Sequence, residues 1–215
     1  QMGLAQSQDQ VVRRTALHVL MEADADGAIV QALLVLLEES KKRVELQVDI
    51  VRAFGRPGLL VAREAVEDFL AHKEIALRAN AAVSLEYIGS PESVGALLKR
   101  APREKESAVA NHMYRAAGRC GVGDAKVRKA LGKKAQGGKT DFATYGPIIG
   151  LAYFEQDAKA ARDVQKALKK EGIPGGRSAW RGGGKRALLA WALTYCGFED
   201  PKAAAFFRED LIPLI

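Results

Sequence analysis

Residues 77–100 read LRANAAVSLEYIGSPESVGALLKR, and this stretch decides which fold the chain can adopt. Its small and apolar residues recur at helical spacing as far as Ile88, which predicts an amphipathic helix. Gly89 follows the last periodic residue, where glycine can end a helix in the left-handed conformation without steric cost. Ser90 and Pro91 then form a preferred start for a second helix, which has its own apolar stripe. The stretch therefore predicts a short pair of helices joined by a tight turn.

A pair of this size cannot bury both apolar stripes alone, so it must stack against similar pairs. The expected turns are 32–34 residues apart, with a last step of 42 residues, and no segment shows the alternation of a strand. We therefore predict an all-α protein, a right-handed α-solenoid of about six helix pairs in a single domain. The turns are expected at Glu22, Gly55, Gly89, Gly121, Glu155 and Gly197. The units span approximately residues 11–40, 41–74, 75–106, 107–141, 142–182 and 183–215.

The quoted stretch resembles the HEAT-like repeat first described in phycobilisome lyases. The resemblance lies in the pattern L-R-x-x-A-A-x-x-L-x-x-I-G-S-P-E-S-V-x-x-L-L of residues 77–98, and residues 12–20 match its first half. Later units keep the helix lengths and turns but lose the arginine, since Ala110 stands where Arg78 does. The resemblance implies the fold. It leaves function open, because this repeat occurs in scaffolds, chromophore lyases and a di-iron hydroxylase.

Composition sets further limits. The chain has 215 residues, 48% of them hydrophobic and 7% aromatic, which favours close packing of helices through small residues. Its longest apolar run, residues 28–37, is too short to span a bilayer. We expect Cys120 and Cys196 to be buried thiols, because two widely separated cysteines do not form a disulfide framework. The cytoplasm is the favoured compartment, and export followed by processing is the alternative that Gln1 leaves open.

The motifs of several enzyme classes are missing. The hydroxylases among the HEAT-like proteins, which this chain resembles, carry repeated His-Glu pairs. Here no histidine is followed by glutamate, because the three histidines precede Val19, Lys73 and Met113. Residues 132–140 resemble a phosphate-binding loop, yet five residues instead of four separate Gly132 from Gly138. A helix is also expected before this segment, where the motif requires a strand. We therefore expect no metal, no cofactor and no catalytic residues.

Basic residues are concentrated in the second half of the chain. Residues 1–95 hold ten basic and fourteen acidic side chains, residues 96–186 hold twenty-one and eight, and residues 187–215 hold two and four. Aligning the expected second helices of the units places several of these cations at equivalent positions. We call these residues the basic ladder: Arg100, Lys129, Lys133, Lys166 and Lys170.

The second helices of HEAT-like stacks generally line the concave side, so the resemblance implies a basic groove inside the C-terminal half. A positive groove concentrates acidic partners electrostatically. We therefore expect a non-catalytic scaffold that holds an acidic protein segment. One alternative is the backbone of a nucleic acid, although few aromatic residues and no base-reading motif accompany the charges. The other is a set of solvated lysines that only keep the protein soluble.

A Gly-rich insertion at residues 169–186 lies within the longer last step. Glycine-rich backbone before a helix can present amide groups to an anion, and Trp180 can stack on an aromatic ligand. In this reading the chain is a lyase-like or chaperone-like binder of a small anionic ligand. The loop would use Arg177, Trp180, Arg181 and Lys185 for this purpose. In the simpler reading, Trp180 covers an apolar end of the last units.

The expected helix at residues 28–37 is apolar nearly all round, which is typical of a helix buried on both sides. An end unit should have a polar outer face instead. This helix is therefore a candidate surface for self-association or for a partner, and plain burial within the stack is the alternative.

Overall fold

The computed structural model describes residues 2–23, 27–137, 142–170 and 184–197, together with Pro201 and Ala205. Within these ranges the chain forms helices joined by turns and contains no strand, which confirms the all-α prediction. None of the described helices combines the length and apolar character that crossing a membrane requires. The α-helices are α1 (Met2–Ala5), α2 (Gln10–Glu22), α3 (Ala28–Glu39), α4 (Val44–Ala53), α5 (Arg63–Asp68), α6 (Ile75–Ile88), α7 (Val94–Arg100), α8 (Ser107–Cys120), α9 (Ala125–Gln136), α10 (Tyr145–Ala152), α11 (Ala158–Lys170) and α12 (Lys185–Gly197).

Five short 3-10 helices complete the described elements. They are η1 (Leu60–Ala62), η2 (Phe69–Ala71), η3 (Pro91–Ser93), η4 (Ala101–Arg103) and η5 (Phe142–Thr144). Four of them flank α5 and α7, so the second helices of these two pairs consist of short segments in sequence rather than one continuous α-helix.

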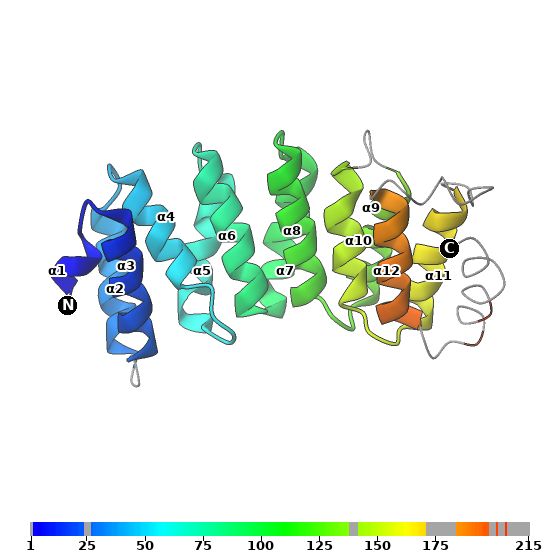
Figure 1. Ribbon diagram of the computed structural model, residues 1–215, viewed down its shortest axis with the longest axis horizontal. Helices are drawn as coiled ribbons and strands as arrows, with labels where there is room; N and C mark the ends of the chain where they lie inside the picture. The colour runs from blue at the N-terminus through cyan, green and yellow to red at the C-terminus, as the bar shows by residue number, and fades with distance from the viewer. Residues whose placement is uncertain are drawn as a thin grey trace.

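The helices form two layers along a row (Figure 1). In the front layer each of α2, α4, α6, α8, α10 and α12 contacts the next. The helices α7, α9 and α11 lie behind this layer, where α9 contacts α11. The buried apolar residues between the layers form one continuous cluster from Ala5 to Cys196.

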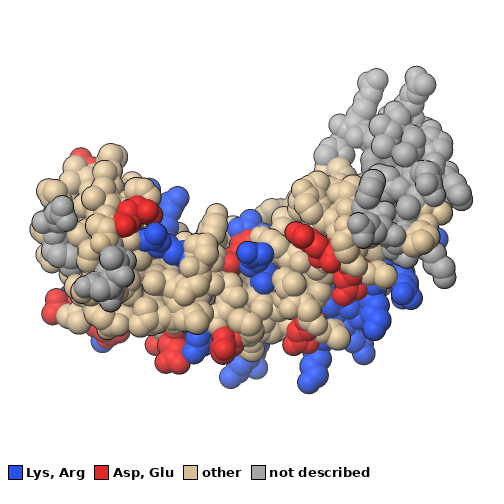
Figure 2. Space-filling view, turned by 90° about the horizontal axis from the view of Figure 1, so that it is seen from below, with Lys and Arg blue, Asp and Glu red and all other residues tan. Residues whose placement is uncertain are grey.

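The molecule is hollowed on one side and bulges on the other (Figure 2). Figure 2 views the molecule from below the view of Figure 1, so the front layer of Figure 1 becomes the upper, hollowed side. The rear layer, which includes α9 and α11, therefore forms the bulging side.

The turn after α6 has the predicted conformation at Gly89. This residue ends the helix with φ 71°, and its N–H donates to the Leu85 carbonyl at 2.9 Å. Ser90 differs from the prediction, because its hydroxyl donates to the Glu92 carboxylate and makes no capping bond to a backbone amide. The chain continues as η3 before α7 begins at Val94.

Two arginines at the same place in their units hold the start of α2 and α6. The Nη1 group of Arg13 donates to the carbonyls six and five residues earlier, at 2.9 and 3.3 Å. Arg78 makes the same two bonds in its own unit, at 2.9 and 2.8 Å. Each arginine also pairs with a buried carboxylate, Asp49 for Arg13 and Glu104 for Arg78. The arginine of the repeated pattern is therefore a structural residue.

Helices α8 and α10 approach each other most closely at glycines. A Cβ atom built on Gly118 would lie closer than 3.0 Å to backbone atoms of Gly150, and one on Gly146 would lie equally close to the backbone of Asn111. The Asn111 side chain also accepts a hydrogen bond from the Gly146 N–H at 2.9 Å. Contact at this range excludes any side chain, so the glycines set the distance between the two helices.

Candidate functional site

The structure separates the residues of the basic ladder. Lys129 and Lys133 lie on α9 and Lys166 and Lys170 on α11, two helices in direct contact, and all four residues are exposed. Arg100 lies apart from them on α7.

Internal bonds already occupy two of these ladder residues. The Nε of Arg100 donates to the Leu70 carbonyl at 3.0 Å, and its Nη2 lies 3.2 Å from Glu104. The Nζ of Lys170 donates to the Gln136 carbonyl at the end of α9, at 2.9 Å. Both residues therefore stabilise the stack, where basic groups near helix ends satisfy unpaired carbonyls.

The expectation that the ladder lines a concave groove is wrong. Helices α9 and α11 belong to the bulging side, and Figure 2 shows Lys and Arg side chains gathered along the lower edge beneath the C-terminal half. The error has a physical origin. The equivalence of the positions follows from helical periodicity, but the direction in which a row of helix pairs curves depends on how the pairs pack.

Two neighbouring helices on the bulging side carry most of the local charge. Together α9 and α11 contain ten Lys and Arg residues and one acidic residue, Asp163. Asp163 pairs with Arg128, which joins the two helices. We call the nine other cations of these helices, all exposed, the basic face: Lys126, Lys129, Lys133, Lys134, Lys159, Arg162, Lys166, Lys169 and Lys170.

The predicted anion loop lies almost entirely outside the described residues. This holds for Arg177, Trp180 and Arg181. Lys185 is the first residue of α12 and is 6% exposed, so it does not project from a loop into solvent.

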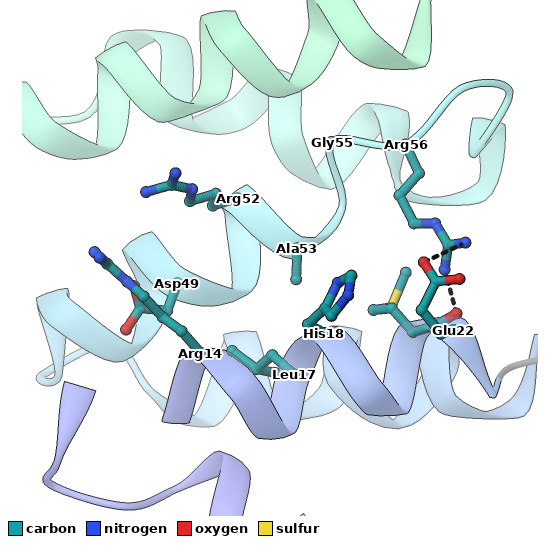
Figure 3. Close-up of a pocket in the computed structure, with 10 residues that line it drawn as sticks. Arg14, Leu17, His18, Glu22, Asp49, Arg52, Ala53, Gly55 and Arg56 are labelled. Atoms are coloured by element: carbon teal, nitrogen blue, oxygen red, sulfur yellow. Dashed lines mark hydrogen bonds and ion pairs between the residues drawn. The ribbon is translucent and has the colours of Figure 1, made fainter. Parts of the chain in front are cut away.

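A pocket of about 430 Å³ opens between α2 and α4 in the front layer (Figure 3). Arg14 and Arg52 lie at one end of it, Glu22 and Arg56 lie at the other, and His18 lies between them. Leu17, Met21, Ala53 and Gly55 add an apolar lining.

Positive charge is in excess at the end of the pocket formed by Arg14 and Arg52. The carboxylate of Asp49 is 1% exposed and accepts from the Nε of Arg13 at 2.6 Å and from the Nε of Arg14 at 2.7 Å. Among the described residues, the Arg52 side chain has no hydrogen-bond or ion-pair partner. Two guanidinium groups therefore pair with one carboxylate, and the unpaired side chain of Arg52 lines the same end of the pocket.

The opposite end of the pocket is electrically balanced. The Nη2 of Arg56 lies 3.1 Å from the Glu22 carboxylate, and its Nη1 donates to the Met21 carbonyl. An anion entering the pocket is therefore attracted to the end formed by Arg14 and Arg52.

A polar network links three helices further along the front layer. Glu86 of α6 accepts from the Nε of Arg115 of α8 at 2.6 Å and from the hydroxyl of Tyr153 of α10. Arg119 lies over the Tyr153 ring, 5.6 Å from its centroid. Burial and the bond to Glu86 raise the pKa of Tyr153 to about 12, so this hydroxyl stays protonated as a donor. The network joins α6, α8 and α10 of neighbouring pairs.

The two cysteines are free and buried, as predicted. Burial raises the pKa of the Cys120 and Cys196 thiols to about 12, which disfavours the reactive thiolate. In the part of the chain that the structure describes, no group of three or more His, Cys, Asp or Glu side chains is placed to hold a metal ion.

Comparison with known proteins supports the fold alone. No protein-family model and no curated protein matches the chain. Among solved structures, an engineered protein from the Northeast Structural Genomics Consortium aligns over 89% of this chain and 92% of its own, with a TM-score of 0.51 and 18% identity. At this identity the likeness concerns the all-helical architecture.

Sequence reasoning missed the pocket between α2 and α4. The net acidic character of residues 1–95 hides a local cluster of cations, because acidic and basic residues distant in sequence pair with each other. Two signals were present: the Arg13-Arg14 doublet and the spacing of Arg52 and Arg56 around the end of a helix. Neither indicated which of these arginines would remain unpaired.

Proposed function

We propose that this protein is a HEAT-like α-solenoid that acts as a non-catalytic scaffold and binds an acidic segment of a partner protein. The contact surface is the basic face of α9 and α11, on the bulging side. This proposal keeps the kind of partner expected from the sequence and moves the contact to another surface.

The density of positive charge on the basic face carries the proposal. The two neighbouring helices carry ten basic residues and one acidic residue, Asp163, which is already paired with Arg128. Clustered like charges repel one another in the free protein, and an acidic partner relieves this repulsion. Complementary charge of this kind raises the association rate and selects the partner.

Lysine chemistry favours an acidic protein segment over a nucleic acid. Eight of the ten cations are lysines, which act as point charges and lack the planar fork with which arginine grips a phosphate. The helices α9 and α11 also contain no aromatic residue on which a base could stack. A binding mode governed by net charge therefore fits best.

The test is reversal of three ladder residues that make no internal bond among those described. The variant K129E/K133E/K166E is compared with K42E/K73E/K105E, which changes the same amount of charge at exposed positions elsewhere. A fluorescent peptide of about twenty glutamates serves as the probe in anisotropy titrations. We expect the first variant to bind at least about tenfold more weakly than the control, because each site loses an attraction and gains a repulsion.

Two outcomes contradict the proposal. If both triple variants lose the same affinity for the peptide, only the total charge of the protein matters and the basic face is not a binding site. Tighter binding of random duplex DNA than of the peptide, with a steep loss on adding salt, points to a nucleic-acid backbone instead.

A further inference from the structure

We propose that the pocket between α2 and α4 binds a small amphipathic anion. Its carboxylate or phosphate head would lie between Arg14 and Arg52, and its apolar body would lie against Ala53, in front of Leu17 and Met21. This site is separate from the basic face, because it lies in the front layer near the N-terminus (Figures 1 and 3).

The head group would find hydrogen-bond donors that are already positioned. Arg14 is anchored through its Nε, 2.7 Å from Asp49, which leaves its two Nη groups directed away from that bond. Arg52 lines the same end of the pocket, and its side chain uses none of its donors within the described structure. Two guanidinium groups with free Nη atoms match the oxygens of a carboxylate or phosphate.

The buried carboxylate at this end does not cancel the positive charge. Asp49 is shared between Arg13 and Arg14, so its single negative charge faces two cations before Arg52 is counted. The fully buried pair of Arg13 and Asp49 also fixes the position of Arg14. The site therefore holds its charges in place before a ligand arrives, which reduces the entropy lost on binding.

The remaining surface of the pocket suits an apolar body. Leu17 and Met21 belong to the hydrophobic core and are 1% and 3% exposed, so they form the back of the apolar wall, and the half-buried Ala53 adds the surface that a ligand can reach. The pocket volume of about 430 Å³ falls in the range of small-molecule sites. The ion pair of Glu22 and Arg56 lies at the far end, where its opposite charges offer no net attraction to an anion.

Four probes separate the contributions of head and body. Phenyl phosphate and 3-phenylpropionate carry both parts, inorganic phosphate carries only the head, and benzyl alcohol carries only the body. Binding is followed by backbone amide chemical shifts in NMR titrations, with the amides of Ala53 and Gly55 as reporters. We expect at least one of the two complete probes to bind with a dissociation constant of about 1 mM or tighter, and both partial probes to bind about tenfold more weakly.

The decisive variant is R52Q, because the Arg52 side chain is exposed and has no hydrogen-bond or ion-pair partner among the described residues. We expect R52Q to weaken the better complete probe about tenfold, since a charge-assisted bond is lost. The matched control is R103Q, an exposed arginine on another surface, which should leave binding unchanged. The variant K129E/K133E/K166E should also bind the probe normally, so failure of the proposed function and failure of this site can be distinguished.

Three results would overturn the assignment. The first is absence of binding by both complete probes. The second is equal affinity of R52Q and R103Q. The third is inorganic phosphate binding as tightly as phenyl phosphate, which would show that the apolar wall contributes nothing.

Discussion

Arg13 and Arg78 show how one side chain can stabilise a helix start and a contact between units. Each donates to two carbonyls before its own helix and to a carboxylate distant in sequence. The side chain of Glu104 is 1% exposed and lies between Arg78 and Arg100. Burial alone would raise the pKa of Glu104, but the bonds from Arg78 and the nearby backbone amide lower it overall. The carboxylate therefore stays ionised within the stack.

Replacing Arg78 by lysine tests this role at the residue scale. A single ammonium group cannot reach Glu104 and both carbonyls together, so buried acceptors lose their donors. We expect R78K to reduce the free energy of unfolding by about 2 kcal/mol in urea denaturation. R103K should change it by less than about 0.5 kcal/mol, because Arg103 is exposed. Equal stability of the two variants would contradict a structural role for Arg78.

At the scale of the element, helix packing changes along the row. Helices α8 and α10 meet through Gly118, Gly146 and Gly150, with backbone against backbone. Gly95 on α7, in contrast, has nothing within 4 Å of the place where a Cβ would lie. Glycines inside helices thus have opposite roles in this chain: those between α8 and α10 are required by the packing, and Gly95 only weakens its helix.

Alanine substitutions distinguish the two kinds of glycine. We expect G118A to lower the free energy of unfolding by about 3 kcal/mol or more, because the added methyl group forces α8 and α10 apart. G95A should raise it by about 0.5–1 kcal/mol, since alanine favours the helix and meets no neighbour. Thermal and urea unfolding measure both. A small effect of G118A would show that the two helices can separate without loss, contrary to the close contact described.

At the scale of the whole molecule, the two proposed surfaces lie on opposite layers. The basic face belongs to α9 and α11, and the pocket lies between α2 and α4. Contacts run mainly between neighbouring helices along the row. Each surface is therefore supported by a different set of helices.

This separation predicts that the two surfaces bind independently. The combined variant K129E/K133E/K166E with R52Q should lose affinity for the glutamate peptide as the triple variant does, and for the small anion as R52Q does. Anisotropy and NMR titrations measure the two affinities in one protein. A change in either affinity when the other ligand is present would reveal coupling between the ends of the stack.

The sequence by itself determined the helical content, the turn at Gly89 and the burial of both cysteines. These properties follow from local periodicity and from the conformational preferences of single residues, which do not depend on distant parts of the chain. It also showed that positive charge is concentrated after residue 95.

Only the tertiary structure decided where that charge points and which cations are unpaired. Arg13 and Arg14 share Asp49 from 36 and 35 residues away, and Arg100 is held by Leu70 and Glu104. These pairings, and the side toward which the row of helices curves, arise from contacts between units. Helical periodicity predicts which face of each helix is apolar, but it contains no information on how one pair is oriented on the next.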